Sequence, residues 1–193
     1  MAKEVEIKFR IADLRTLTRA LKRAGFKQAT PPTHEMNVLY DLPRQKLRRQ
    51  GQLLRLRQYG DQWVLTHKSK GTAGRHKTRV ELETRVENGE RMDAILRALG
   101  YTPTFRYEKF RAEWSDGAGH VVLDQTPVGV FGEIEGAPLW IDRTAGALGV
   151  QPTDYVTQTY ADLFFQWKRK TRSQASEMTF RAVGTRRPSR PQS

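Results

Sequence analysis

Charged and apolar side chains alternate along the first residues of the chain, and this alternation constrains the fold more than any other feature. Glu4, Glu6 and Lys8 are separated by Val5 and Ile7. In an extended strand successive side chains point to opposite faces, so the charged groups share one face and the apolar groups share the other. A single strand of this kind is typical of an ordinary sheet whose polar face is in water.

The same spacing of like charges recurs along the chain, and its repetition favours a different interpretation. The further pairs are Arg55/Arg57, Lys68/Lys70, Glu81/Glu83, Lys109/Arg111 and Glu133/Glu135. Like charges gathered along one solvent-facing side of a strand have no evident structural use. A closed antiparallel barrel gives them one, because charged side chains then line its interior while the apolar set packs outward beneath helices. The alternation therefore predicts a barrel with a polar binding chamber inside.

The composition of this chamber suits a polyanion that arrives with a divalent metal ion. Carboxylate oxygens are the ligands that hard cations such as Mg²⁺ and Mn²⁺ prefer. Guanidinium and ammonium groups hold phosphate oxygens. A chamber that combines both kinds of side chain is therefore expected to bind a phosphorylated substrate together with Mg²⁺ or Mn²⁺.

A series of motifs in a fixed order resembles the CYTH superfamily, the triphosphate tunnel metalloenzymes, and looks closest to its class IV adenylate cyclase-like branch. Residues 4–8 (EVEIK) look like the ExExK signature of that superfamily. The matches cover residues 2–168 and continue with Asn37, Tyr40-Asp41, 54–57 (LRLR), 65–68 (LTHK), 79–83 (RVELE), 108–111 (EKFR), Leu123-Asp124, 131–135 (FGEIE) and 159–163 (TYADL). The resemblance implies an α+β fold, in which a closed eight-stranded antiparallel β-barrel forms a tunnel with a charged lumen and helices pack outside.

Roles for single residues rest on this chemistry and gain weight where the resemblance implies the same role. The triphosphate-binding residues are expected to be Lys8, Arg55, Arg57, Lys68, Arg79, Lys109 and Arg111. The metal ligands are expected to be Glu4, Glu6, Asp124, Glu133 and Glu135, and the catalytic residues Glu4, Glu6, Lys8, Glu81 and Glu83. Glu81 and Glu83 would hold a second metal ion or orient a water molecule, and Arg79 would grip phosphate or brace these carboxylates. The alternative for each residue is a purely structural ion pair.

Two reactions are compatible with such a site. Water can attack the terminal phosphorus and release phosphate, or a ribose 3′-hydroxyl can attack the α-phosphorus of ATP and yield cyclic AMP and pyrophosphate. Both need the triphosphate held in line and its charge neutralised, and the motifs describe this shared grip rather than a nucleoside pocket. We slightly favour hydrolysis of ATP, tripolyphosphate or thiamine triphosphate over a class IV adenylate cyclase, because hydrolysis needs only a metal ion and water.

A third hypothesis comes from a different class of protein, a non-catalytic polyphosphate- or RNA-binding module. Carboxylates that face the ligand argue against it, because a pure anion binder gains nothing from acidic side chains in its binding site.

Charge and composition set the expected boundaries of the domain. We expect a CYTH-like triphosphate tunnel domain over residues 1–168 and a basic, disordered tail over residues 169–193, because the tail is rich in Arg, Ser, Pro and Gln. Residues 168–193 hold eight Lys or Arg and one Glu, which is +7 of the net charge of +13. Nucleic acid is therefore not expected as a partner except through the tail.

Several absences narrow the setting in which the chain works. The chain has no cysteine, which excludes disulfides and thiol catalysis and agrees with a reducing compartment. No apolar stretch resembles a signal peptide or a membrane span, so we expect a soluble cytoplasmic protein without a membrane partner. The four histidines lack the spacing of a zinc site. The oligomeric state stays open.

Local signals place the helices and hairpins. Asp13 is expected to cap a helix that runs to Ala24, and a second helix is expected over residues 88–99. Gly60-Asp61 and residues 115–117 indicate hairpins. Residues 26–36 are polar and contain two prolines, so they are expected to form a loop. Further helices are expected at residues 139–148 and 154–168.

Overall fold

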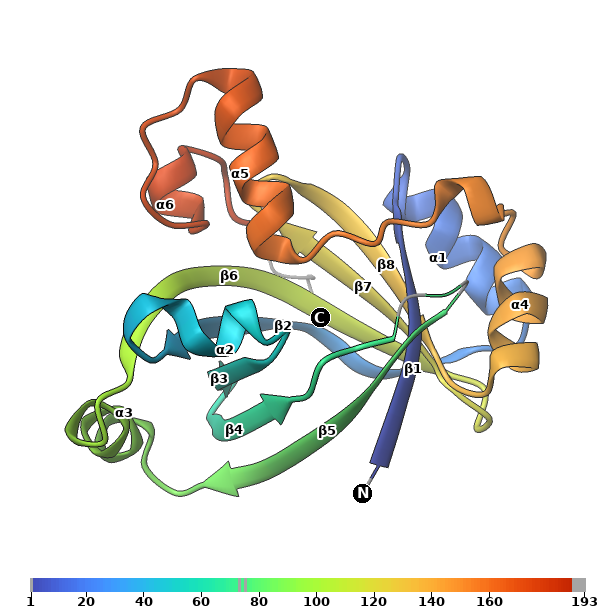
Figure 1. The fold of residues 1–193 in the computed structure, drawn as a ribbon. Helices are drawn as coiled ribbons and strands as arrows, with labels where there is room; N and C mark the ends of the chain where they lie inside the picture. Colours follow the sequence, from blue (N-terminus) through green and yellow to red (C-terminus); the bar gives the residue numbers. More distant parts are fainter. Residues whose placement is uncertain (1, 73, 75, 189–193) are drawn as a thin grey trace.

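A closed barrel of antiparallel strands forms the centre of the molecule (Figure 1). The structure is a computed structural model that describes residues 2–72, 74 and 76–188. Within these residues eight strands pair in the order β1-β5-β4-β3-β2-β6-β7-β8, and β8 closes the barrel against β1. They are β1 (Ala2–Arg10), β2 (Lys27–Asp41), β3 (Leu53–Tyr59), β4 (Gln62–Lys68), β5 (Lys77–Val86), β6 (Thr102–Ser115), β7 (His120–Thr126) and β8 (Gly129–Glu135). The predicted fold class is confirmed.

The register between neighbouring strands brings charged residues to the interior face. Lys8 on β1 lies opposite Glu133 on β8, and Lys68 on β4 lies opposite Glu81 on β5. Residues two apart in a strand share a face, so the charged neighbours of these residues face the same way. Residues between them point outward, and Ile134 is fully buried there beneath the helices.

Helices cover the outer surface of the barrel. They are α1 (Leu14–Arg23), η1 (Pro43–Gln45), α2 (Lys46–Arg49), α3 (Gly89–Ala98), α4 (Pro138–Ala147), η2 (Pro152–Asp154), α5 (Tyr160–Thr171) and α6 (Phe180–Val183). Helices α1 and α4 pack together on one apolar cluster beside β1 and β8, α5 packs on a second beside β6, and α3 on a third beside β3 (Figure 1). Asp13 caps α1 as predicted, and Asn88 caps α3. In the described ranges, no helix combines the length and the apolarity that a membrane crossing requires.

The segment 26–36, for which the sequence predicts a loop, instead forms most of strand β2, so the loop prediction is wrong. Its partner β6 is nearly as long, and β2 pairs with it from Lys27 to Asp41. The register shifts between Gln28 and Thr30 and again between Thr30 and Thr33. Irregular positions of this kind accommodate Pro31 and its neighbour, because proline cannot donate a ladder hydrogen bond.

The segment after residue 168 also differs from the disordered tail that the sequence predicts. Helix α5 continues to Thr171, and Met178 and Phe180 are buried against the barrel. Met178 bridges to β6 beside Tyr107, and the Phe180 amide donates a hydrogen bond to the buried Glu108 carboxylate. Met178 and Phe180 therefore anchor this segment on the barrel despite its low apolar content. Residues 189–193 of the predicted tail lie outside the described residues.

Candidate active site in the tunnel

The barrel encloses a cavity of about 1000 Å³ that side chains from all eight strands line. Every residue that the sequence predicts for the site lines this cavity, with the exception of Asp124. Acidic and basic groups from strands distant in the sequence therefore meet in one enclosed space.

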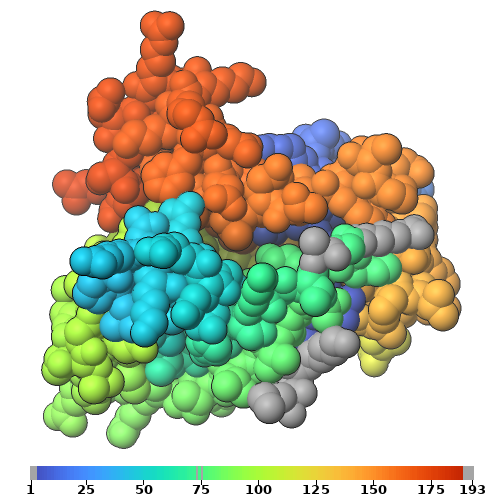
Figure 2. All heavy atoms as spheres, viewed as in Figure 1, coloured from blue at the N-terminus to red at the C-terminus, as the bar shows by residue number. Residues whose placement is uncertain are grey.

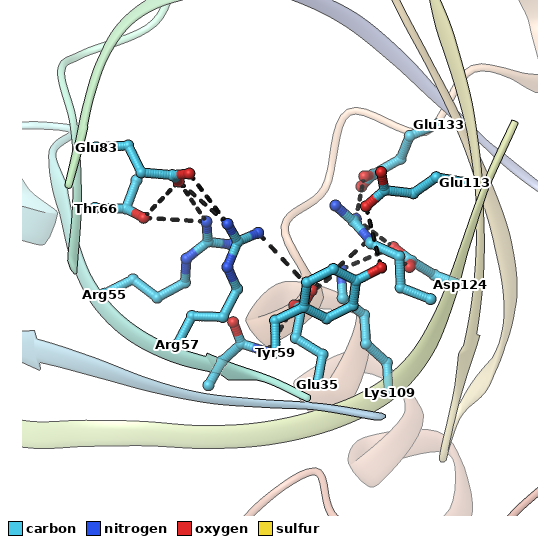
Figure 3. Close-up of polar contacts among 12 residues, drawn as sticks. Glu35, Arg55, Arg57, Tyr59, Thr66, Glu83, Lys109, Glu113, Asp124 and Glu133 are labelled. Carbon is cyan, nitrogen blue, oxygen red and sulfur yellow. Dashed lines mark hydrogen bonds and ion pairs between the residues drawn. The ribbon is translucent and has the colours of Figure 1, made fainter. Parts of the chain in front are cut away.

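The basic side of the tunnel is arranged around one buried carboxylate, Glu35 on β2 (Figure 3). Its oxygens lie 3.4 Å from Lys109 Nζ, 3.8 Å from Arg57 Nη1 and 3.9 Å from Arg111 Nε. Asn37 Nδ2 donates a 2.9 Å hydrogen bond to Oε1. Among the described residues Oε2 receives no hydrogen bond, so this carboxylate interacts mainly through charge.

The pKa of Glu35 reports how strongly these cations act. Burial raises the pKa of the carboxyl group, but the charges of Lys109, Arg111, Arg55 and Arg57 outweigh burial and hold it well below its ordinary value. Glu35 is therefore ionised at neutral pH. It holds together side chains that would otherwise repel one another.

Asp124 belongs to the same network and lies behind the tunnel surface. Its Oδ1 accepts a 2.8 Å hydrogen bond from Arg111 Nε, and its Oδ2 accepts from Lys109 Nζ at 2.8 Å and from the Tyr160 hydroxyl at 2.6 Å. Burial raises the pKa of Tyr160 far above its ordinary value, and the negative charges of Asp124 and Glu133 act in the same direction. Because both oxygens of Asp124 already accept hydrogen bonds, a metal ion would have to displace a donor to reach it.

The acidic side of the tunnel is formed by Glu4, Glu6, Glu133 and Glu135 on β1 and β8, and the first three of these form ion pairs. Arg79 lies 3.1 Å from Glu4 and 3.6 Å from Glu6, Lys77 lies 3.4 Å from Glu6, and Arg111 lies 2.6 Å from Glu133. Lys68 Nζ lies 2.7 Å from Glu4 Oε1 and Lys8 Nζ lies 3.3 Å from Glu133 Oε1. In the described residues Glu135 forms no ion pair of this kind, although it lies directly opposite Glu6 in the sheet. Burial, followed by the charges of Glu4 and Glu6, raises the pKa of Glu135 to about 7.

The carboxylates of the acidic side are of the kind that binds divalent cations. The donors are carboxylate oxygens from adjacent strands, which suit Mg²⁺ or Mn²⁺. A bound cation would relieve the repulsion that raises the pKa of Glu135. As the side chains of the described residues stand, no three of them converge as ligands on one point, so the carboxylates would have to turn toward a shared ion.

Glu81 and Glu83 on β5 are held by basic side chains. Lys68 Nζ lies 3.1 Å from Glu81 Oε2, so that Lys68 joins Glu81 to Glu4. Arg57 Nη2 lies 3.2 Å from Glu83 Oε1, and the Thr66 hydroxyl donates to Glu83 Oε2 at 2.9 Å (Figure 3). These two acids therefore brace Lys68 and Arg57 in this arrangement. Glu83 is also the more exposed, with 40% of its side chain accessible.

The comparison with known families agrees with this geometry, because the CYTH domain model matches residues 2–180. The chain belongs to the CYTH family. Members of this family are triphosphatases or class IV adenylate cyclases, which makes the chain an enzyme of one of these two kinds. The match extends beyond residue 168 and so includes part of the segment that packs through Met178 and Phe180.

Individual relatives of this CYTH protein carry both activities in their descriptions. It is 28% identical over 133 residues to a candidate adenylate cyclase from Methanocaldococcus jannaschii. This alignment covers 68% of this chain and 75% of the other. A solved candidate adenylate cyclase from Vibrio parahaemolyticus matches with a TM-score of 0.75 at 20% identity, covering 84% of this chain and 97% of the other. A candidate adenylyl cyclase from Hippeastrum, described as having a dominant triphosphatase activity, matches with a TM-score of 0.63 at 17% identity, over 84% and 95% of the chains.

Two tunnel residues of this CYTH protein are absent from the predicted site. Glu35 lies two residues before Asn37, the spacing that places two side chains on the same face of a strand. The nearby prolines favoured a loop, so Glu35 was not assigned to a strand. The Tyr160 hydroxyl is the second, because the sequence predicts only a packing role for this aromatic residue. No local pattern separates an inward-facing tyrosine at the start of a helix from one in the apolar core.

Proposed function

We propose that this chain is a divalent-metal-dependent triphosphatase that binds a triphosphate in the tunnel and releases its terminal phosphate. The observation that carries the proposal is the pairing, in one enclosed cavity, of a preassembled basic side with a group of carboxylates on β1 and β8, of which Glu135 forms no ion pair among the described residues. A simple anion-binding protein has no use for the acidic side. A metal-dependent phosphoryl transfer enzyme needs both.

Each side of the tunnel would contribute a different part of the reaction. Arg55, Arg57, Lys109 and Arg111 hold the phosphate oxygens, and the ion pairs around Glu35 keep them in place before substrate arrives. This fixed arrangement lowers the barrier, since the donors need no reorganisation when negative charge moves during the reaction. Lys8, Lys68 and Arg79 complete the grip on the phosphates at the boundary with the acidic side.

The carboxylates of Glu4, Glu6, Glu133 and Glu135 would hold Mg²⁺ or Mn²⁺, which neutralises triphosphate charge when bound. Glu81 and Glu83 lie on β5, the strand that pairs with β1, and one of them would orient the attacking water. Glu83 is the better placed of the two, because its carboxylate is more accessible than that of Glu81.

The second candidate function is a class IV adenylate cyclase. The descriptions of the relatives from M. jannaschii and V. parahaemolyticus favour it. The description of the Hippeastrum protein favours hydrolysis in a related tunnel. We rank hydrolysis first because it needs only a bound metal ion and a water molecule, without a nucleoside site.

The test is to incubate the protein with ATP, tripolyphosphate and thiamine triphosphate in turn, each with Mg²⁺ or Mn²⁺, and to assay phosphate, pyrophosphate and cyclic AMP. Phosphate as the main product supports the proposal, and cyclic AMP with pyrophosphate as the main products would contradict it. Glu6→Gln should abolish turnover while retaining triphosphate binding. The matched control is Glu90→Gln on α3, an exposed acid remote from the tunnel, which should leave turnover unchanged.

A further inference from the structure

The positive net charge of the chain lies outside the tunnel. Among the described residues nine basic and nine acidic side chains line the cavity, so their formal charges cancel. The whole chain nevertheless has a net charge of +13. Part of this surplus lies in residues 14–27, which contain five Lys or Arg and no acid. This stretch covers α1 and the first residue of β2.

Four of these cations form a stripe along the outer face of α1, the helix that lies on the outside of the barrel beside α4 (Figure 1). All four are exposed, and they are Arg15, Arg19, Lys22 and Arg23. Their spacing of three and four residues places them on one side of the helix. Leu17 and Leu21 lie on the opposite side and are buried in the apolar cluster that α1 shares with β1 and β8.

The stripe lowers the stability of the helix that carries it. Arg15 and Arg19, and again Arg19 and Arg23, are like charges four residues apart, a spacing at which they repel each other. Arg15 also lies in the first turn, where the helix dipole disfavours a positive charge. Within the described residues none of the four cations forms an ion pair, and the Asp13 carboxylate accepts hydrogen bonds from the backbone amides of Arg15 and Thr16. A stripe that served only solubility would mix acids with bases and gain stability from their pairing.

We propose that the outer face of α1 binds the phosphate backbone of double-stranded nucleic acid. The stripe suits this partner in the kind and spacing of its charges. Three of the four cations are arginines, whose planar forks bind two phosphate oxygens at once. From Arg15 to Arg23 the helix advances roughly 12 Å, a length over which one strand of a duplex presents about three or four phosphates. Contacts of this kind carry no sequence information, so the binding is independent of base sequence.

An anionic membrane fits this face less well than nucleic acid does. A helix that lies in a membrane interface turns bulky apolar side chains toward the lipid. On α1 the bulky apolar side chains of Leu17 and Leu21 instead face the core of the protein. The face that remains is charged without an apolar border, which suits a partner that is bound through charge alone.

This surface is separate from the basic tail, to which the sequence prediction confines contact with nucleic acid. Counting charge by segment did not reveal it, because the count does not show that the cations of α1 share one exposed face. No residue of α1 lines the tunnel cavity. The inference is therefore independent of the proposed function, and an enzymatically inactive protein would still test it.

The experiment measures binding of a fluorescently labelled DNA duplex of about 20 base pairs by anisotropy, at several salt concentrations between about 50 and 200 mM. The variant carries Arg15→Gln, Arg19→Gln and Arg23→Gln together. We expect its affinity to fall at least about ten-fold, and the slope of log K against log salt to lose roughly two to three. Glutamine is a good helix former and the repulsion along α1 is removed, so the variant should melt no lower than wild type.

The matched control removes the same charge from the end of α5, through Arg169→Gln, Lys170→Gln and Arg172→Gln. These residues are exposed, and Figure 1 shows α5 and α1 on different parts of the barrel, while in Figure 2 the α5–α6 part projects from the surface in orange-red. The control should retain the salt slope of wild type and lose less than about three-fold in affinity. Hydrolysis of tripolyphosphate, where the protein has it, should be unchanged in both variants.

Three results would overturn the inference. Wild type could fail to bind the duplex, or both variants could lose affinity equally, which would assign binding to net charge rather than to α1. The third result is sedimentation with phosphatidylserine vesicles that depends on the stripe when duplex binding does not, because it would make an anionic membrane the partner.

Discussion

Glu35 and Glu135 are carboxylates of the same tunnel, yet their environments shift their pKa values in opposite directions. Four cations hold the pKa of Glu35 well below its ordinary value, whereas burial and the acids Glu4 and Glu6 raise that of Glu135 to about 7. Burial opposes ionisation at both sites, so the neighbouring charges decide the difference. Neighbouring cations compensate the charge of Glu35, whereas Glu135 has no ion pair among the described residues and lies beside two further acids.

Removing carboxylates from the acidic side of the tunnel should have the largest effect on activity. Glu6→Gln combined with Glu135→Gln takes two charges from the region that we assign to the metal ion. We expect metal-dependent phosphate release to fall about 100-fold or more, because even indirect disturbance of a metal site costs 10–100-fold. Phosphate release measured across a Mn²⁺ titration checks this. Unchanged turnover at every Mn²⁺ concentration would show that the acidic side does not hold the catalytic metal.

Removing Glu35 from the centre of the basic side should instead lower the free energy of unfolding. Glu35→Gln leaves Lys109, Arg111, Arg55 and Arg57 without their common counter-charge, and loss of one partner in a buried ionic network costs about 3–5 kcal/mol. Urea unfolding of the metal-free protein measures this loss. Tripolyphosphate should then raise the melting temperature of the variant more than that of wild type, because it restores negative charge among the cations. An equal rise in both proteins would mean that Glu35 does not organise the cations that we propose to bind phosphate.

The raised pKa of Glu135 makes the stability of the metal-free protein depend on pH. An ordinary glutamate titrates near 4.5 and folded Glu135 near 7, so between these values the folded protein binds a proton that the unfolded chain has lost. The free energy of unfolding therefore falls as pH rises through this window and stays low above pH 7. Glu135→Gln removes this effect. The free energy of unfolding of the variant, relative to that of wild type, should therefore rise by about 1–3 kcal/mol from pH 5 to pH 8.

Urea unfolding at the two pH values, without metal, measures this difference. Saturating Mn²⁺ should recover the lost stability of wild type at pH 8 and do so less in the variant, because one carboxylate of the proposed site is missing. A difference between variant and wild type that is the same at both pH values would mean that Glu135 is not repelled by its acidic neighbours.

The sequence did not predict the residues on the two sides of the tunnel equally well. Strict period-two alternation revealed the barrel and the residues around the cavity, because a strand has only two faces and one of them is covered by helices. Glu35 was missed since a proline-bearing segment can be a loop or an irregular long strand, and only the length of β6 decides between them. The burial of Asp124 behind the tunnel surface depends on Tyr160, which arrives from a helix 36 residues later in the chain.

The smallest expected effect concerns a third buried carboxylate, Glu108, on the outer face of the same strand pair that carries Glu35. Glu108 is 1% exposed, and its Oε2 lies 3.1 Å from Arg187 Nη2 and 2.6 Å from His34 Nε2. Unlike Lys109 beside Glu35, Arg187 is largely solvated, with 61% of its side chain exposed. Its charge is therefore screened by water.

Arg187→Ala should reduce the free energy of unfolding by only about 0.2–1 kcal/mol, the range of exposed ion pairs. The neighbouring exposed Arg186→Ala is the matched control and should change it less. Limited proteolysis should nevertheless cut the segment after residue 180 faster in Arg187→Ala, because the contact ties this segment to β6. A loss comparable to that of Glu35→Gln would mean that the outer carboxylate depends on its ion pair with Arg187 as strongly as the four cations of the basic side depend on Glu35. In that case the buried ion pairs around Glu35 and the solvent-exposed ion pair of Glu108 would not differ in strength.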